Sequence, residues 1–271
     1  MNKFDIKRFW QTLCWVVVEN WRTLALWTAT FSLGALLAEF FFIVVMHQPY
    51  EACVSVGIGV CAFFLMLAVL VSISCPLTAF ASKQRRIALF SLPASNLEKF
   101  LAVIVYASVI NVVAIFVAFA VGDTLRMLVF PLLYKDCGLV SGVQAMLTSM
   151  LNFIKGLLEV PWQVALLNGL MLVWTHSVYT LGGTLFRKWS FVIVSAVLMI
   201  LSLCFSMLMV VLVEHGLVPG DYISIENMKL IVSWLGYLGI MVLAALSVFN
   251  YLASYRIFTR MQVESRRWLN V

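Results

Sequence analysis

Long apolar runs, separated by short polar segments, set the pattern of this chain. A helix needs about 20 mostly apolar residues to cross the hydrocarbon core of a bilayer. Six runs have this length, at residues 23–46, 53–81, 97–121, 161–185, 190–213 and 230–253. No remaining segment is long enough and polar enough to form a separate soluble domain. The pattern therefore predicts an all-α integral membrane protein, in which residues 1–271 form a single transmembrane domain with six transmembrane helices.

The N-terminal segment shows helical spacing ahead of the first run. Its apolar side chains are Ile6, Phe9, Trp10, Leu13, Val17 and Trp21, whereas Lys7, Arg8 and Gln11 occupy the other side. A basic amphipathic segment rich in tryptophan is typical of a helix in the headgroup layer. Residues 1–22 are therefore expected to form a cytoplasmic interfacial helix. The alternative is a cytoplasmic extension of the first span.

The segment 122–160 is too apolar for a free loop. One helical stripe consists of Val143, Met146, Leu147, Met150, Leu151, Ile154 and Leu158. We expect an amphipathic helix that lies flat on the outer surface or dips into it, and an earlier short helix from Thr124 to Tyr134, interrupted by Pro131. Such elements are tolerated at membrane depth where protein buries them or where they line a cavity. They would either cap a translocation path or pack on the neighbouring spans.

Composition and charge add an orientation to this picture. Hydrophobic residues make up 63% of the chain and charged residues 11%, with a mean hydropathy of +1.03, which excludes an ordinary soluble domain. Fourteen of the eighteen Lys and Arg residues lie in the N-terminal arm, in 82–99, at 187–188 and after residue 251. The positive-inside rule then places both termini in the cytoplasm. A seventh span at 139–158 would turn the basic tail outward, against this bias.

The distribution of the net charge of +6 over cytoplasmic loops indicates the membrane rather than a nucleic acid as partner. No GxxxxGK[ST] or HExxH motif occurs, and the three histidines are scattered. We therefore expect no enzyme activity, cofactor or metal in this chain. An intramembrane enzyme would rest only on Glu39, His176 and Ser177, and the last two are adjacent, so they point to different helix faces. Cys53 and Cys137 both fall near the outer face, where they either pair or stay free.

Polar side chains inside apolar spans are the usual pointers to function. The candidates are Glu39, Asn111, Asn168, Thr175, His176 and Tyr179. Each of them either lines a translocation path or makes a hydrogen bond between helices.

The basic loop from Ser82 to Lys99 is the place where the chain is expected to meet a soluble partner. It holds Lys83, Arg85, Arg86 and Lys99 with a single acid, Glu98. Ser95 and Glu98 have the spacing of a capping box, in which serine and glutamate satisfy free N–H groups at a helix start. The next helix should therefore begin at about Asn96.

Six spans, an amphipathic N-terminal helix, this basic loop and the missing ATPase motif together resemble permease subunits of the type-2 ABC transporter class. The sequence Leu89-Phe90-Ser91-Leu92-Pro93-Ala94-Ser95-Asn96-Leu97-Glu98-Lys99 is similar to that family's LLxxPxSxxE pattern, and the LPASNLEKF version looks like that of permeases from Bacteroidetes-type bacteria. The likeness covers the topology, but its motif covers only these residues. The chain departs from the family in two places. Many members carry an acidic residue and a Gly-Thr pair upstream of the leucines, where this chain has residues 82–88 without them. Many members also have a longer re-entrant element between the fifth and sixth spans, where this chain has only residues 214–229.

The resemblance implies a multi-pass ABC exporter permease in a bacterial inner membrane. Its coupling segment, with Lys83, Arg85, Arg86, Leu89, Phe90 and Leu92, would dock on a separate ABC ATPase subunit that carries ATP and Mg²⁺. Pro93, Ser95 and Glu98 would form the turn into the third span. A second permease copy or a sister permease would complete the dimer. The alternative is a non-transport membrane anchor or sensor subunit that holds a cytoplasmic partner through the same loop.

Overall fold

The computed structural model describes residues 4–44, 59, 62–63, 66, 70–71, 83–133, 141–186, 189–215 and 234–260. These residues form helices joined by short turns, and no β-strand occurs among them. The helices are α1 Ile6–Glu19, α2 Trp21–Val44, α4 Lys83–Ser91, α5 Asn96–Val105, η2 Tyr106–Ile110, α6 Asn111–Leu133, α7 Gly142–Glu159, α8 Trp162–Leu185, α9 Ser190–Glu214 and α11 Trp234–Arg260. The all-helical prediction is confirmed for this part of the chain.

Four of the described helices are long and apolar enough to cross a membrane, at Asn96–Val129, Trp162–Leu185, Ser190–Leu208 and Gly236–Arg260. They correspond to the third, fourth, fifth and sixth predicted spans. The first predicted span coincides with α2, which is not among the four, and most of the second lies outside the described residues. Helix α7 is also not among them, so it gives no support to a seventh span.

The chain divides into two compact units. One contains residues 1–73 and 88–155, and the other contains residues 74–87 and 156–271. The division falls within α4 and within α7. We describe each unit by itself.

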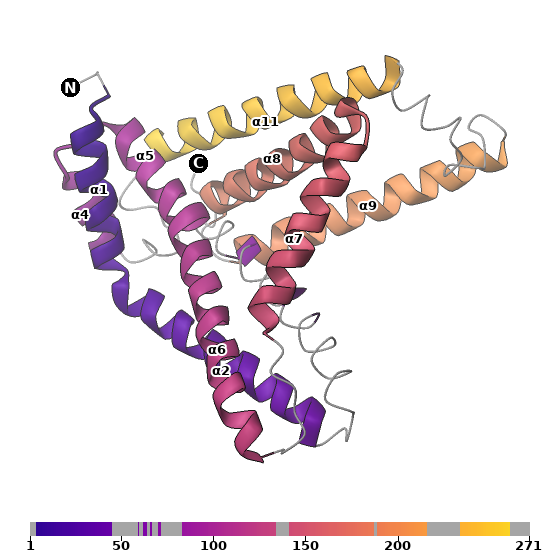
Figure 1. The fold of residues 1–271 in the computed structure, drawn as a ribbon. Coiled ribbons are helices and arrows are strands. Elements are labelled where there is room, and N and C mark those ends of the chain that lie inside the picture. Colours follow the sequence, from indigo (N-terminus) through magenta and orange to yellow (C-terminus); the bar gives the residue numbers. More distant parts are fainter. Residues whose placement is uncertain are drawn as a thin grey trace. The chain divides into compact units, whose positions relative to one another are not determined.

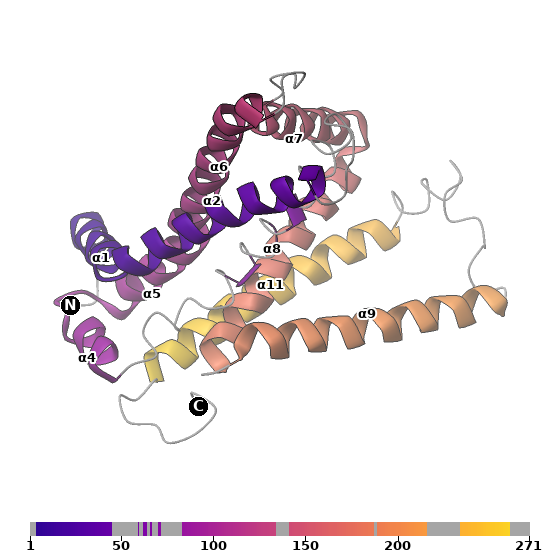
Figure 2. The same cartoon turned by 90° about the horizontal axis from the view of Figure 1, so that it is seen from below.

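In the first unit, helices α1 and α2 lie alongside the helix formed by α5, η2 and α6. Helix α1 packs along α5 and η2, and α2 packs against α6 further along (Figures 1 and 2). At the second contact the Ser32 hydroxyl donates to the Ala118 carbonyl at 2.7 Å, and Phe31 packs on the buried Phe119. A small hydroxyl that bonds a neighbouring backbone allows two apolar helices to approach closely.

The third predicted span is one continuous helical rod from Asn96 to Leu133. A π-helical turn, η2, joins α5 to α6, and its Tyr106 and Ala107 are buried where the rod meets α1. A π-turn inserts an extra residue into the helix and rotates the side chains that follow. The separate short helix predicted from Thr124 to Tyr134 is wrong, because residues up to Leu133 continue α6 with Pro131 inside it.

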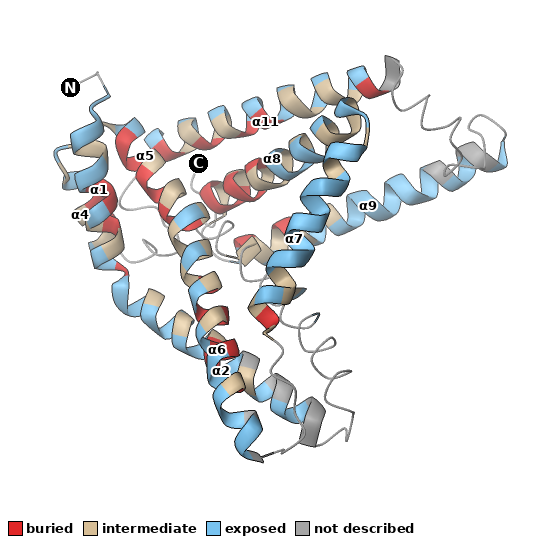
Figure 3. Cartoon of the chain, in the orientation of Figure 1, coloured by how far each residue is buried: buried red, intermediate tan, exposed pale blue. Residues whose placement is uncertain are grey.

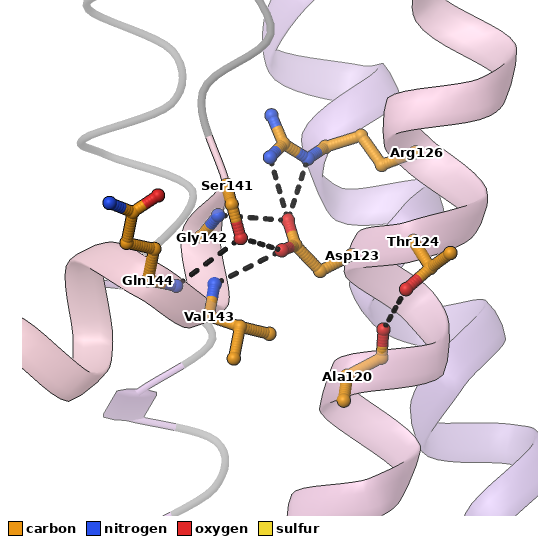
Figure 4. A network of polar contacts seen from close by, with 8 residues as sticks. All are labelled: Ala120, Asp123, Thr124, Arg126, Ser141, Gly142, Val143 and Gln144. Carbon is orange, nitrogen blue, oxygen red and sulfur yellow. Dashed lines mark hydrogen bonds and ion pairs between the residues drawn. The ribbon is translucent and has the colours of Figure 1, made fainter.

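A buried carboxylate on α6 holds the start of α7 (Figure 4). Asp123 accepts hydrogen bonds from the Ser141 hydroxyl and from the backbone N–H groups of Gly142 and Val143, each at 3.0 Å. Arg126, one turn along α6, pairs with the same carboxylate at 2.6 Å. First-turn N–H groups have no partner within their own helix, so a carboxylate there satisfies them and complements the helix dipole.

In the second unit, α8 is the central helix. Gln163 of α8 contacts Tyr237 of α11, and further along both helices His176 contacts Tyr251. Residue numbers rise in the same direction along both helices, so the two helices run parallel. Helix α9 follows α8 after a short connection, and Tyr179 stacks on Phe191 where the two begin to separate. Two parallel helices with a returning helix between them in sequence are what three consecutive membrane crossings require.

The surface of these helices is strongly apolar. Along α9 most described residues are exposed, and the large apolar side chains among them include Phe205 and Met207, which are 62% and 72% exposed (Figure 3). Monomeric soluble proteins rarely expose apolar patches of this size, whereas lipid tails cover them without cost. The exposure therefore agrees with the membrane character of the sequence.

Gly182 on α8 permits the close approach of α9. A Cβ atom at this position would overlap Cγ2 of Val194, a β-branched side chain with little rotamer freedom. Gly182→Ala should therefore destabilise the α8–α9 pair by about 1–3 kcal/mol, as overpacking does. Thermal unfolding of the purified protein in detergent would measure the loss.

Gly169→Ala is the matched control on the same helix, because no atom lies within 4 Å of its added Cβ. It should leave the unfolding temperature unchanged or raise it, since alanine favours a helix over glycine by about 1 kcal/mol. Val194→Ala in the Gly182→Ala background should restore stability. Equal stability of the two alanine variants would contradict the close approach.

Candidate functional site: the basic turn before α5

Helix α4 occupies the segment that the sequence marks as the docking loop. It spans nine residues, Lys83–Ser91. Its Leu89 is 1% exposed and Arg86 is 4% exposed, so this side faces protein. Gln84, Ile87 and Ser91 are exposed and lie three and four residues apart, which places them on one face. The helix therefore has a buried side and a distinct outward side.

The turn after α4 is short and ordered by its backbone. The Leu92 N–H donates to the Leu89 carbonyl at 3.3 Å, and the Ala94 N–H donates to the Leu92 carbonyl at 2.8 Å. Pro93 is exposed at its tip. Proline fixes its own φ and lacks an N–H, so it ends a helix without leaving a donor unsatisfied.

The predicted capping box is confirmed. Ser95 has an extended backbone and accepts from the Glu98 N–H, while the Glu98 carboxylate accepts from the Ser95 N–H at 2.7 Å. Helix α5 begins at Asn96, where the sequence places it. The two residues satisfy each other's free donors, so the turn and the helix start form one rigid piece.

Glu98 also joins this turn to the N-terminus of the chain. Its carboxylate accepts from the Asp5 backbone N–H at 2.8 Å and from the Arg8 guanidinium at 3.0 Å. The Glu98 side chain is fully buried, and that of Arg8 is 28% exposed. Sequence reasoning missed both partners, because no spacing rule connects residues that lie 93 and 90 positions apart.

A second inward charge ties the end of α4 to α5. Lys99 is buried, and its ammonium donates to the Phe90 carbonyl at 2.8 Å. A cation at the C-terminus of a helix satisfies a free carbonyl and complements the helix dipole. Lys99 therefore holds the turn together, although in the sequence it counts as one more charge of a basic loop.

The other predicted docking residues of this segment are mainly intermediate in exposure. Arg85, Phe90 and Leu92 are half-buried, and Lys83 begins the helix with its side chain outside the described residues. The outward residues Gln84, Ile87 and Ser91 were not among the predicted docking residues. Their helical spacing is the signal that would have found them.

The polar residues predicted within the spans are distributed over both units. Asn111 begins α6 and Glu39 lies on α2, with its side chain outside the described residues. The other four lie on α8, in the second unit. Asn168 and Thr175 donate to carbonyls of their own helix, those of Val164 and Met171. Asn168 is exposed and Thr175 is half-buried.

His176 and Tyr179 make bonds between helices. His176 Nδ1 lies 2.7 Å from the Tyr251 hydroxyl of α11, and the Tyr179 hydroxyl lies 3.0 Å from the Ser195 hydroxyl of α9. Asn250 adds a third bond by donating to the Ser177 hydroxyl at 3.0 Å. Sequence reasoning missed the partners on α11, although polar residues there recur at helical spacing: Ser247, Asn250, Tyr251 and Ser254.

These contacts bear on the chemistry of the chain. The Ser177 hydroxyl donates to the Trp174 carbonyl, so in the described structure it is directed to its own backbone. No group of three or more His, Cys, Asp or Glu side chains that could hold a metal ion occurs within the described ranges. Cys14 and Cys204 are free and exposed, whereas Cys53 and Cys137 lie outside the described residues.

Comparison of the chain with family models, curated proteins and solved structures finds no match.

The Glu98 carboxylate can be tested by Glu98→Gln. The amide keeps the shape but replaces one acceptor oxygen by a donor, so it cannot serve all three N–H groups. We expect a loss of about 1.5–3 kcal/mol, the range for hydrogen bonds to charged groups. The Asp5 N–H and Arg8 share one oxygen and the Ser95 N–H uses the other, so the amide nitrogen should face Ser95 and backbone hydrogen exchange should rise there.

Glu159→Gln is the control for this variant, because Glu159 is an exposed acid at the end of α7. It should not change exchange at Ser95. Unchanged exchange at Ser95 in Glu98→Gln would show that the carboxylate does not hold the turn.

Proposed function

We propose that this chain is the transmembrane permease subunit of an ATP-driven type-2 ABC exporter. Its α4 binds a separate ATPase subunit on the cytoplasmic side, and ATP hydrolysis there drives movement of cargo past the spans. The proposal includes six spans with both termini in the cytoplasm of a bacterial inner membrane, and a dimer with a second copy or a sister permease. It rests on the motif of the turn and on the geometry of α4.

The geometry of α4 is the observation that carries this proposal. A subunit driven by another chain needs a short rigid element that is exposed on one side and attached firmly on the other. Helix α4 has an outward face at Gln84, Ile87 and Ser91, while Lys99 and Glu98 attach the following turn to α5 and α1. A movement of the ATPase would be lost in a flexible loop, whereas a rigid α4 passes it to α5 and α1.

The helix directions support the proposed topology. Helices α8 and α11 run parallel with α9 between them in sequence, as expected when the fourth and sixth spans both run towards the cytoplasm. The basic residues Arg256 and Arg260 then lie at the cytoplasmic end of α11.

The docking face is tested by Ile87→Glu. Ile87 is 46% exposed on the outward side of α4, so a charge there should spare the fold and disrupt an apolar contact with the partner. An interface core residue typically contributes about 1–3 kcal/mol, so co-purification of the ATPase with the tagged chain should fall by about tenfold or more. The readout is the amount of a co-purified protein that carries a P-loop and hydrolyses ATP.

Gln11→Glu is the matched control, since it adds the same charge at an exposed position of α1. Equal recovery of the ATPase with both variants would contradict docking through α4. Recovery of no P-loop protein with the unaltered chain would favour the second candidate, a membrane anchor or sensor subunit.

The interhelical bonds of His176 and Tyr179 favour that second candidate, because they explain two of the four candidate polar residues on α8 by packing alone. Asn168 separates the two functions. Its side chain is exposed and its amide bonds only the Val164 carbonyl of its own helix among the contacts described, so Asn168→Leu should leave packing intact.

For an exporter, Asn168→Leu removes a polar contact with cargo and should lower export by about tenfold, with ATPase co-purification unchanged. Export is measured in the culture medium. The exported compounds are those that are missing from the medium of cells that lack the chain and that are present again when the chain is restored. Ser202→Leu is the control, because the exposed Ser202 likewise bonds a carbonyl of its own helix, on α9. Full export by Asn168→Leu would contradict a path along α8.

A further inference from the structure

Helix α1 has a buried face, an exposed apolar face and a polar face, whereas the sequence pattern predicts only an apolar side and a polar side. Its buried face consists of Thr12, Leu13, Val16 and, just beyond the helix, Asn20, and the contacts of α1 are mainly with α5. The apolar stripe expected to lie in lipid is therefore divided, because Leu13 points into the protein. The remaining apolar residues form a second face.

This second face is exposed and apolar. Ile6, Trp10, Cys14 and Val18 follow one another at four-residue intervals, and the three large ones are 73%, 62% and 67% exposed. Four-residue spacing places them along one side of the helix. We call these four residues the outer face of α1.

The surroundings of the outer face indicate what covers it. Lys7 is exposed beside it, and Arg22 stacks over Trp21, with its guanidinium 5.9 Å from the ring centroid. The apolar surface also continues beyond Asn20 onto α2, where Leu26 and Trp27 are 68% and 53% exposed. Tryptophan with flanking cations, running into a long apolar helix, is the composition that binds the headgroup layer of an anionic leaflet.

The polar end of the same helix reaches the turn. Asp5 and Arg8 hold the Glu98 carboxylate, one directly through its backbone N–H and the other through its guanidinium. Any movement of α1 along or away from the membrane surface therefore acts on the residue that fixes the start of α5. The outer face and the Glu98 contact lie on one rigid helix of 14 residues.

We propose that α1 is a lipid-responsive arm of the turn. Its outer face binds an anionic leaflet, and this binding keeps Asp5 and Arg8 on Glu98. In a membrane without anionic lipid α1 is bound less firmly, and the Ser95–Glu98 turn opens more often. The inference holds for a transporter and for an anchor alike, because it involves only this chain and the lipid.

The native Cys14 allows a direct test of the outer face. The full-length protein, with its other five cysteines replaced by serine, is labelled at Cys14 with an environment-sensitive fluorophore and placed in lipid nanodiscs. The control carries Gln11→Cys and Cys14→Ser, because Gln11 lies on the neighbouring polar face of α1. Quenchers attached to lipid should act more strongly on the Cys14 label, and iodide in the water should act more strongly on the Gln11→Cys label.

The lipid response is measured by backbone hydrogen exchange at Asp5, Ser95 and Glu98. Each basic residue near an anionic leaflet strengthens binding by about fivefold, since it contributes about 1 kcal/mol. With Lys7 and Arg22 both near the leaflet, exchange should therefore be about 25-fold slower in discs that contain phosphatidylglycerol than in discs of phosphatidylcholine alone. Lys7→Gln with Arg22→Gln should remove most of this difference without changing exchange in phosphatidylcholine.

Three results would overturn the proposal. Strong iodide quenching at Cys14 would mean that the outer face lies in water. Protection of Cys14 from both quenchers would mean that a protein covers it. Equal exchange at Ser95 and Glu98 in the two kinds of disc would mean that lipid contact does not reach the turn.

Discussion

The buried carboxylate of Glu98 is the interaction on which the packing of α1 against the start of α5 depends. It accepts bonds from the Ser95 N–H, the Asp5 N–H and the Arg8 guanidinium, and it is fully buried. An unpaired buried charge is costly, whereas one with several donors is stable and directional. Because two donors come from the N-terminus, the geometry of the turn is complete only when α1 is formed and docked. A local capping motif has thereby become a tertiary contact.

The membrane imposes the other main constraint, since backbone and side-chain polar groups must find partners within the protein. Serine, threonine and asparagine along α8 satisfy this by bonding carbonyls one turn back, as Thr175 and Asn168 do. Where helices meet, the bonds cross instead, as between Ser177 and Asn250. Asp123 and Arg126 solve the same problem for a charge pair at the far end of α6, and there the carboxylate also receives the first turn of α7. Polar side chains of the described helices thus bond mainly their own backbone, and at a few contacts they join helices.

The parts of the fold that could be predicted are those set by local rules. Hydrophobic periodicity located the helices, and the Ser95–Glu98 spacing located the start of α5. The error at Thr124–Tyr134 arose because the third span was ended at residue 121, although α6 continues through Asp123 and Pro131 to Leu133. The partners of Glu98 and Asp123 could not be predicted, because each pairing depends on which helices pack together. The candidate docking face was predicted as a segment but not as a face, since burial of Arg86 is a tertiary property.

The burial of Arg86 and Lys99 also changes how the turn is expected to work. A basic loop suggests docking by charge, but two of its cations point inward, and the exposed centre of α4 is Ile87. Docking through an apolar side chain on a rigid helix depends on shape, so it is less sensitive to salt than an exposed ion pair would be. In the proposed docking, a displacement of α4 would reach α5 through the bond between Lys99 and the Phe90 carbonyl, and α1 through Glu98. The inward charges of this loop therefore fix the turn, and the outward face of α4, with Ile87 at its centre, is left for the partner.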